Sequence, residues 1–444
     1  MLSVKKFKLM GFAFLILIPT SLFSLGYIHW QENGVPVHEG TGALKPAIVS
    51  DSDGGGMVFW VDTRFEPFLG IYGQRVDSSG LLLWSPEVRV QDSIGRGLVL
   101  VSDGEGGGVV IWGGVYDDIW SVYAARVTGS GGVMWVRRVS YREDVSDYYV
   151  AVSDGYGGVV VAWVQAAQSG YDVYVQRVSA NGTKLWGNGI NVSQSGAVHF
   201  NYPSISMIRH DSEPYFTICW TDARTGSYDI YAQLMDLNGN ELWEEGGRPV
   251  CTEGHVQSMP KITSLDGRIL VVWSDKRYGN FDVYMQLLSF SGGFLWDSGG
   301  IPLLSDDYTE VVGNVLGGTD KVIVTGDRWY GGYARVYAHA VDSVGNLLWG
   351  TEGVDVGIIC DTSQSMQGVP FPVMTPDYEG GVIVAWQALL DSTWDIYAQH
   401  VNSQGEALWG EYGLPVCTAE GIQKMPSITT DEQNGAIIVW TDIR

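Results

Sequence analysis

The sequence is poor in positive charge. Among its 444 residues, 26 are Lys or Arg and 50 are Asp or Glu, which gives a formal net charge of −24. A surface this acidic repels phosphate backbones and anionic lipid headgroups, so the charge balance argues against a nucleic-acid partner. We expect the acidic residues mainly to keep the protein soluble, and Ca²⁺ binding by some of them is the alternative.

Long apolar runs are missing after the N-terminus, where Leu9–Ile18 is apolar but too short to span a bilayer. The basic residues Lys5, Lys6 and Lys8 precede it. Ser24–Gly26 then offers small residues at the positions that a signal peptidase recognises. These features predict a signal peptide at residues 1–26, with an uncleaved anchor as the alternative. We expect residues 27–444 to be secreted, extracellular or at the cell surface (the periplasm is an alternative), without membrane insertion after cleavage.

Cysteine is scarce, with four residues in the chain. Cys251 and Cys417 occupy the same position in two copies of an internal repeat, and Cys360 lies close to that position. Equivalent positions in different repeats lie farther apart than the roughly 7 Å between Cα atoms that a disulfide allows. Cys219 falls within an apolar run. We therefore predict four buried thiols and no disulfide framework.

Recognisable catalytic motifs are missing as well. The sequence has no G-x-S-x-G, H-E-x-x-H, P-loop or C-x-x-C pattern, and its seven histidines are scattered without a recurring third metal ligand. Fifty acidic residues could supply a carboxylate pair for glycoside hydrolysis, but the sequence gives no way to choose two of them. On this ground we do not expect an enzyme.

What the sequence has instead is one repeat along most of its length. The stretch Trp220–Trp243 returns from Trp273 and again from Trp386, and weaker copies fill the intervals of roughly 50 to 60 residues. Three aromatic columns mark it. A Tyr recurs at 72, 123, 174, 231, 284, 337 and 397; a Trp closes one strand at 60, 112, 163, 220, 273, 386 and 440, with Thr325 in its place once; and a second Trp recurs at 30, 84, 135, 186, 243, 296, 349 and 409.

Each repeat predicts four strands joined by tight turns. The turn before the last strand has a short polar residue first and Gly fourth, at Asp77/Gly80, Thr128/Gly131, Ser179/Gly182, Asp236/Gly239, Ser289/Gly292, Asp342/Gly345 and Asn402/Gly405. This is hairpin chemistry, because the polar side chain bonds forward and Gly accepts the left-handed conformation. Short antiparallel strands in a regular repeat predict an all-β fold, a β-propeller of four-stranded antiparallel blades.

The number of blades is left between two values. Eight blades are favoured, with the last one incomplete: it would borrow the N-terminal strand around Trp30 and lack its third strand, because the C-terminal repeat stops at Arg444. Seven blades with spare strands at both ends is the alternative. The first of these predicts that the chain is a fragment of a longer protein.

The phrase DIYAQ-x-V-x-x-x-G-x-x-LW-x-x-x-G-x-PV resembles a tandem propeller repeat of large secreted bacterial proteins, most of them uncharacterised. The resemblance covers residues 30–444. It implies the propeller fold and, in that family, often a C-terminal sorting or anchoring domain after the repeats. It implies no catalytic residue.

Several aromatic residues are candidates for ligand binding. Trp329, Tyr330 and Tyr333 stand outside the repeat pattern, while Trp120 and Trp394 belong to a column at the mouth of a recurring loop. Aromatic faces at such positions can stack on sugar rings. Packing is the competing interpretation for the column, and Trp329 could refill the space that the missing strand-end Trp leaves.

The loop itself carries a D-x-R motif at Asp62/Arg64, Asp222/Arg224, Asp275/Arg277 and Asp442/Arg444, and an acid follows Arg224 and Arg277 five residues later. We expect Arg224 and Arg277 to form bidentate pairs with Asp229 and Asp282.

Asp51 and Asp53 offer alternating oxygen ligands and are the candidates for Ca²⁺, the one cofactor considered. Plain turn chemistry is the competing interpretation, because the further acids and the distal Glu of an EF-hand loop are absent.

The sequence thus favours a monomeric, secreted or cell-surface, non-catalytic β-propeller that acts as a binding or scaffold module for a protein or glycan partner. A lectin-like protein that binds glycans through the loop aromatics is one alternative. A glycoside hydrolase or lyase domain is the other.

Overall fold

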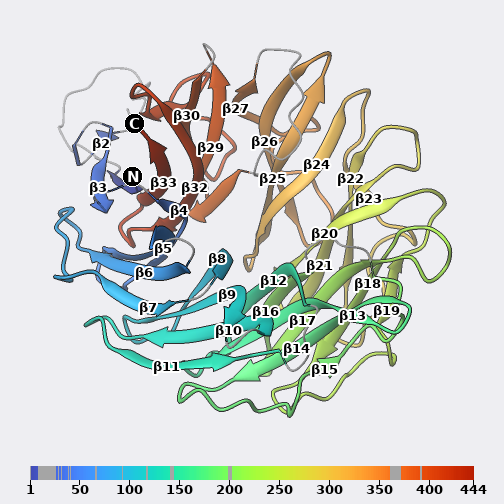
Figure 1. Cartoon of the computed structure of the whole chain (residues 1–444). Coiled ribbons are helices and arrows are strands. Elements are labelled where there is room, and N and C mark those ends of the chain that lie inside the picture. Colours follow the sequence, from blue (N-terminus) through green and yellow to red (C-terminus); the bar gives the residue numbers. More distant parts are fainter. Residues whose placement is uncertain are drawn as a thin grey trace.

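The computed structural model describes residues 2–8, 27–28, 30–31, 33–38, 40, 42–65, 68–92, 94–116, 119–140, 145–198, 203–360, 372–390 and 393–444. In these ranges every regular element is a β-strand. No helix long and apolar enough to cross a membrane occurs in the described part of the chain. Successive strands form antiparallel sheets arranged in a ring (Figure 1). The predicted all-β propeller class is confirmed.

We call each group of four successive antiparallel strands a unit and number the units along the chain. Unit one holds β4 (Ala43–Ser50), β5 (Gly56–Phe65), β6 (Phe68–Val76) and β7 (Val88–Asp92). Unit two holds β8 (Ile94–Ser102), β9 (Gly108–Tyr116), β10 (Ile119–Val127) and β11 (Val133–Arg138). Unit three holds β12 (Val145–Ser153), β13 (Val159–Ala167), β14 (Gly170–Val178) and β15 (Ile190–Asn191). Unit four holds β16 (Ser204–His210), β17 (Glu213–Asp222), β18 (Asp229–Met235) and β19 (Arg248–Cys251).

The remaining units follow the same order. Unit five holds β20 (Gln257–Leu265), β21 (Arg268–Asp275), β22 (Asp282–Leu288) and β23 (Ile301–Leu304). Unit six holds β24 (Thr309–Leu316), β25 (Lys321–Tyr330), β26 (Tyr333–Asp342) and β27 (Val354–Cys360). Unit seven holds β28 (Val373–Pro376), β29 (Val382–Leu390), β30 (Thr393–Val401) and β31 (Leu414–Cys417). Units six and seven are joined into one eight-stranded sheet by β27 and β29, so the number of blades stays a prediction.

The last sheet closes the ring with both ends of the chain. It combines β32 (Ile422–Thr430) and β33 (Ala436–Ile443) with β1 (Leu2–Lys8), β2 (Tyr27–Ile28) and β3 (Val35–His38). Trp30 packs in one core cluster with Ile437 and Val439, so the N-terminal segment does join the C-terminal strands.

The third-strand position of this last sheet differs from the expectation that it is empty. β1 runs antiparallel to β33, with Leu2 opposite Thr441 and Phe7 opposite Ala436. The residues that fill this position belong to the predicted signal peptide, of which residues 9–26 lie outside the described part. The signal peptide itself stays a prediction.

The strand-end tryptophans form the centre of the core. They are at most 2% exposed in every unit that has one, namely Trp60, Trp112, Trp163, Trp220, Trp273, Trp386 and Trp440. All of them except Trp440 lie directly opposite the Tyr of the next strand, as Trp220 does with Tyr231. Since these sheets are covered on both faces by neighbouring units, the strands are apolar on both faces, and burial of one such aromatic stabilises the fold by roughly 1.5–3 kcal/mol.

The second tryptophan column connects neighbouring units. Its indole Nε1 donates a hydrogen bond to a turn carbonyl of the following unit: Trp30 to Ser78 (3.3 Å), Trp84 to Gly129 (3.1 Å), Trp135 to Ala180 (2.9 Å), Trp186 to Leu237 (3.2 Å), Trp243 to Phe290 (3.0 Å) and Trp349 to Ser403 (3.2 Å). We call this contact the tryptophan latch. It explains why the Trp and the hairpin turn recur together.

The hairpin turns have the predicted chemistry. In unit four, Asp236 Oδ1 accepts hydrogen bonds from the amides of Asn238 (2.8 Å) and Asn240 (2.9 Å), and Gly239 has a φ of 88°. The same Gly lies against the latch, since a Cβ on it would come within 2.9 Å of Trp186. Gly therefore serves both the turn conformation and the close approach of the next unit.

The Gln of the DIYAQ motif holds the segment that leads into the outer strand through its side-chain amide. Gln233 Nε2 donates to the carbonyl of Glu244 (2.9 Å), and its Oε1 accepts from the amide of Trp243 (3.1 Å).

All four cysteines are buried and none forms a disulfide, as predicted. Burial raises the pKa of the Cys251 thiol to about 12, so it is not a reactive thiolate.

Candidate functional site

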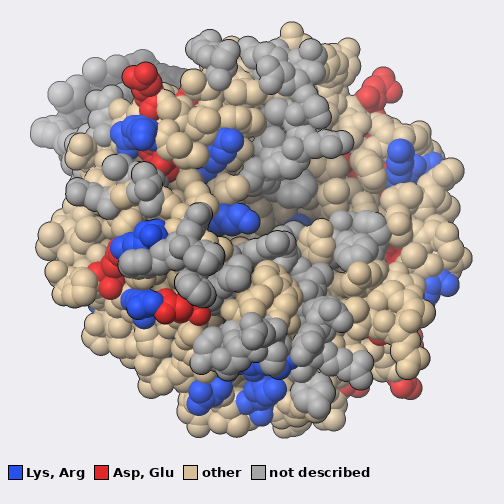
Figure 2. Space-filling model, viewed as in Figure 1, with Lys and Arg blue, Asp and Glu red and all other residues tan. Residues whose placement is uncertain are grey.

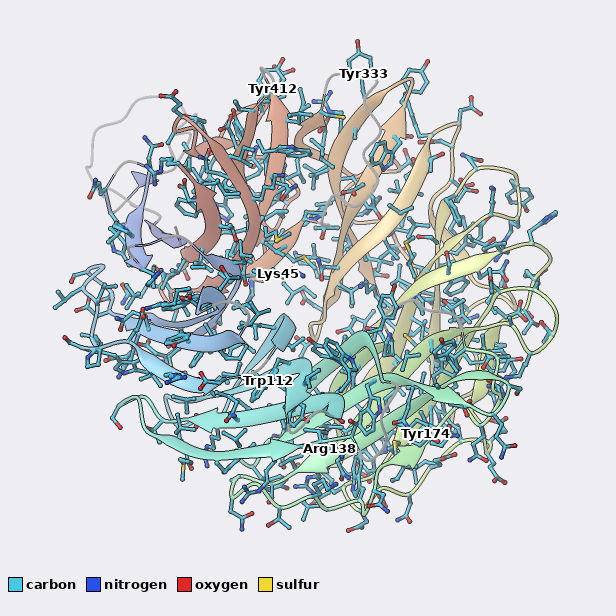
Figure 3. The ribbon with its side chains drawn as sticks, in the orientation of Figure 1. Lys45, Trp112, Arg138, Tyr174, Tyr333 and Tyr412 are labelled. Carbon is cyan, nitrogen blue, oxygen red and sulfur yellow. The ribbon has the colours of Figure 1, made fainter. Side chains whose placement is uncertain are left out.

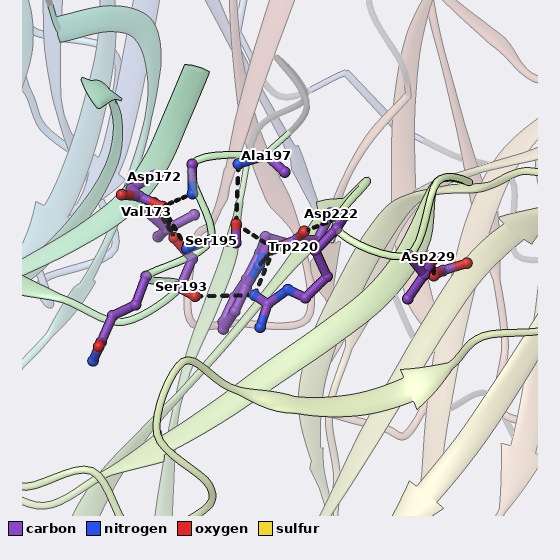
Figure 4. A network of polar contacts seen from close by, with 12 residues as sticks. Asp172, Val173, Ser193, Ser195, Ala197, Trp220, Asp222 and Asp229 are labelled. Atoms are coloured by element: carbon purple, nitrogen blue, oxygen red, sulfur yellow. Dashed lines mark hydrogen bonds and ion pairs between the residues drawn. The ribbon is translucent and has the colours of Figure 1, made fainter. Parts of the chain in front are cut away.

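The D-x-R loops of the regular units hold a local network rather than a pair across the loop. Arg224 Nη2 lies 2.6 Å from Asp222 Oδ2, which also accepts from the indole of Trp220 at 3.1 Å. Asp229 is bonded to Ser227 and Thr225, and Figure 4 shows it apart from the Asp222 network. The expected pairs of Arg224 with Asp229 and of Arg277 with Asp282 are therefore wrong, because each Arg folds back on the Asp two residues earlier.

The hydrogen bonds of the loop favour the ionised form of Asp222. Although burial acts in the opposite direction, hydrogen bonds from Arg224 and Trp220 lower the pKa of Asp222. The Arg224 guanidinium also lies 4.1 Å from the ring centroid of Tyr231. In unit four the Asp and the Arg of the motif are therefore engaged within the loop itself.

Unit six breaks this pattern at its core. The strand register places Gly326, not Thr325, opposite Tyr337, so Gly326 occupies the tryptophan column and the expected assignment of Thr325 is wrong. Tyr337 is 2% exposed and donates its hydroxyl to the carbonyl of Val311 at 3.2 Å. A Cβ on Gly326 would lie 2.7 Å from that hydroxyl, so the glycine makes room for the buried tyrosine.

The same register reverses the charge at the loop end of the unit. In units four and five the two opposed residues beyond the tryptophan column are both acidic, Asp222 with Asp229 and Asp275 with Asp282. In unit six the corresponding opposed residues are Arg328 and Arg335. An otherwise acidic protein thus presents two neighbouring guanidinium groups at this position.

These arginines line a pocket of about 480 Å³. Its walls are Tyr308, Arg328, Tyr330, Tyr333, Arg335, Val336, Tyr337, Glu352 and Asp355. Tyr330 and Tyr333 are 62% and 55% exposed, and Figure 3 places Tyr333 at the rim of the molecule. Tyr308 meets Tyr330 edge to face with ring centroids 4.8 Å apart, and the Arg328 guanidinium lies 5.3 Å from the centroid of Tyr308.

The carboxylates around Arg328 and Arg335 are unequal partners. Glu310 is completely buried and its Oε1 lies 3.0 Å from Arg328 Nε. Burial, with Asp306 nearby, raises the pKa of Glu310 to about 8. Burial alone raises the pKa of Asp327 to about 8. In both acids burial thus favours the protonated form.

The other acidic partners are more exposed. Arg335 Nε lies 2.7 Å from Asp355 Oδ2, and Arg328 Nη2 lies 3.5 Å from Asp306 and 3.9 Å from Glu352. Both side chains of the Arg335–Asp355 pair are more than a third exposed, so water weakens this ion pair. A ligand anion could replace such partners at little cost.

The predicted ligand residues separate into two groups. Tyr330 and Tyr333 come together in the pocket, whereas Trp329 packs against the core cluster between units six and seven. Trp394 packs against that same cluster, and Trp120 packs against the cluster between units two and three. The packing interpretation is therefore the one that describes the three tryptophans.

Sequence reasoning missed Tyr308, Arg328, Arg335 and Glu352 as pocket residues. The available signal was the replacement of acidic by basic residues in the sixth repeat, which becomes visible only when the strands are paired in register.

The Ca²⁺ candidates take part in a turn. Asp51 Oδ1 accepts from the amides of Asp53 and Gly55, both at 2.9 Å, and its Oδ2 accepts from Arg75 Nε at 2.9 Å. Asp53 points its carboxylate into solvent. Among the described residues no group of three or more His, Cys, Asp or Glu is placed to hold a metal ion.

Charged side chains are interspersed over the face seen in Figure 2, and a basic one lies near its centre, where Figure 3 places Lys45. Lys45 is exposed and adopts a φ of 52° at a bulge in β4.

No family model matches this chain. No curated protein matches it either. Solved structures do. An ulvan lyase of polysaccharide lyase family PL25, bound to -[GlcA(1-4)Rha3S]-, is 10% identical with a TM-score of 0.47, over 83% of this chain and 95% of its own. The polysaccharide lyase Uly1 is 8% identical with a TM-score of 0.42, over 100% of this chain and 98% of its own. The exotype rhamnogalacturonan lyase YesX is 12% identical with a TM-score of 0.40, over 93% and 74%.

These similarities correct the expected function. The leading expectation was a non-catalytic scaffold and not an enzyme, yet these three structures are polysaccharide lyases, as the alternative of a hydrolase or lyase domain had it. None of their residues is transferred to this chain. The chemistry assigned to unit six rests on its own geometry.

Proposed function

We propose that the protein cleaves acidic polysaccharides by β-elimination at the pocket of unit six. The observation that carries the proposal is the pair Arg328 and Arg335, set among Tyr308, Tyr330 and Tyr333 where units four and five carry acidic pairs. Two guanidinium groups bind one carboxylate well, and tyrosine rings at a pocket rim offer flat faces to a pyranose ring.

The residues divide the work as follows. Arg328 and Arg335 neutralise the uronate carboxylate, which acidifies the proton on the adjacent C5. A base removes that proton, the C4–O bond breaks with its electron pair on the departing oxygen, and this oxygen takes up a proton. The product carries a C4=C5 double bond, and no water is consumed.

Tyr308 is the candidate for proton transfer. Its ring centroid lies 5.3 Å from the guanidinium of Arg328, the group proposed to bind the uronate carboxylate. Tyr330 and Tyr333, the more exposed pair, are the candidates for holding the sugar ring. The raised pKa of Glu310 supports the scheme, because a protonated Glu310 competes less with the substrate carboxylate for Arg328.

The remaining expectations join this proposal. A glycan is the partner, and export through the signal peptide at residues 1–26 would bring the protein to extracellular acidic polysaccharides. Membership of the tandem propeller repeat family of secreted bacterial proteins is part of the same proposal, and no metal has a part in the scheme.

The test is incubation with polygalacturonate, alginate and hyaluronan, followed by ultraviolet absorbance of the unsaturated uronate. We expect Tyr308→Phe to lower kcat by roughly 10²- to 10⁴-fold and Arg328→Gln to raise KM. Tyr278→Phe is the control, because Tyr278 is an exposed tyrosine of unit five that does not line the pocket. Equal rates for Tyr308→Phe and Tyr278→Phe, or no unsaturated product from any of the three polymers, would overturn the proposal.

A further inference from the structure

No tryptophan latch joins units five and six in the described part of the chain. Trp296 belongs to the same column as the latch tryptophans, and the equivalent acceptor would be the carbonyl of Ser343. Its Nε1 has no hydrogen-bond partner among the described residues, and Trp296 is only partly buried.

The Trp296 ring lies farther from the turn of the next unit than the latch tryptophans do. A Cβ on Gly345 would lie 3.6 Å from the nearest ring atom of Trp296. The corresponding distances at the latched boundaries are 3.2, 3.3, 2.8, 2.9, 3.1 and 2.6 Å.

A pocket of about 590 Å³ lies between Trp296 and the turn that begins at Ser343. It is lined by turn residues of three units, including His210 of unit four, Phe290 of unit five and Ser343 of unit six, together with Trp296. The turns that form it join first to second and third to fourth strands, whereas the Arg328 pocket lies at the loops between second and third strands. The two pockets are therefore on opposite faces of the ring.

The pocket contains an unpaired cation. Arg268 lines it and makes no ion pair or hydrogen bond with its side chain in the described part of the chain. Asp266 is an exposed neighbour two residues away. An unpaired guanidinium is unusual in a chain with a net charge of −24, in which most described arginines are ion-paired.

Aromatic side chains complete the wall. The His210 ring stacks on Phe290 with centroids 3.9 Å apart and planes inclined by 12°, and Tyr215 meets Phe290 edge to face at 4.8 Å. The stack holds a flat surface beside two hydrogen-bond donors that lack acceptors, Arg268 and the indole of Trp296.

We infer that this pocket is a second carbohydrate site, which binds an anionic sugar residue through Arg268 and Trp296 on the face opposite the Arg328 pocket. The anion is a carboxylate or a sulfate, the charge that a guanidinium and an indole N–H would share. The inference rests on the proposed function in one respect: the site holds a distant part of the same polymer. It contributes binding and takes no part in bond cleavage.

The test is calorimetric titration with alginate-derived and dextran-sulfate-derived oligosaccharides, which separate carboxylate from sulfate. We expect Arg268→Gln and Trp296→Phe each to weaken binding of at least one ligand by roughly tenfold. Arg209→Gln is the control for charge, because Arg209 lies on the same face outside the pocket and donates to the carbonyl of Ser212. Trp186→Phe is the control for loss of an indole N–H that is engaged in a latch.

The two proposals fail separately. Binding that depends on Arg268 in a protein without lyase activity supports the second site and refutes only the proposed function. Binding equal to that of the wild type in both Arg268→Gln and Trp296→Phe, or absence of binding to both ligands, would overturn the second site whatever the lyase assay gives.

Discussion

Replacement of the turn glycine of unit four measures how strongly neighbouring units depend on one another. Gly239→Ala introduces two separate penalties. The φ of 88° disfavours any L-residue by roughly 1–2 kcal/mol. The new Cβ would also lie 2.6 Å from Ile190 Cδ1 and 2.9 Å from Trp186 Cδ1, and such overpacking costs about 1–3 kcal/mol. Together they predict a loss of about 2–5 kcal/mol in the free energy of unfolding.

Two other glycines separate these penalties. Gly226 has a φ of 98° with no atom within 4 Å of its added Cβ, so Gly226→Ala carries only the backbone cost. Gly254 has neither a left-handed backbone nor a close neighbour, so Gly254→Ala should leave stability unchanged. Urea unfolding, followed by tryptophan fluorescence, gives the three midpoints. Equal midpoints for Gly239→Ala and Gly226→Ala would show that the contact with Trp186 carries no energy. Equality with Gly254→Ala would refute the turn geometry as well.

Two pH-dependent predictions concern unit six. Burial lowers the pKa of His339 below 6.5, so its contribution to stability is present above that pH and is lost as pH falls. His339→Gln, which restores the residue of the repeat, should make the melting temperature less sensitive to acid between about pH 8 and about pH 5, and an unchanged pH profile would contradict this. The pH dependence expected for Asp327 has the opposite sign, because burial raises its pKa to about 8. Its contribution to the stability of the fold is complete below pH 3.8 and is lost as the pH rises through about 8. Asp327→Asn should remove that loss, and a variant that destabilises with rising pH as the wild type does would count against the buried acid.

The fold could be predicted from the sequence because the same core and turn residues recur in most of the repeats. Tryptophan columns and a polar-to-glycine turn need no knowledge of register, so Trp220 and Asp236–Gly239 were assigned correctly. Where the pattern breaks, sequence spacing alone counts residues wrongly. Thr325 was aligned with the tryptophans, whereas strand pairing puts Gly326 there.

One residue of shift decides which side chains meet in a strand. Successive side chains of a strand point to opposite faces of the sheet. Arg328 and Tyr330 therefore line the pocket, while Trp329 between them packs against the core cluster on the other face. The pattern break around Trp329 was visible in the sequence. Its division into a buried residue and two pocket residues, and the pairing of Arg328 with Arg335 across the hairpin, require the register.

The tryptophan latch also bears on how the chain is made. At each latch the indole donates to a turn that the ribosome synthesises later, so a latched unit is secured only after its successor has emerged. The first latch in the sequence joins Trp30 to Ser78. Trp30 also packs against the sheet that contains β32 and β33, and these two strands come from the C-terminal end of the chain. The first residues translated must therefore wait for the last ones before their own strand positions are occupied.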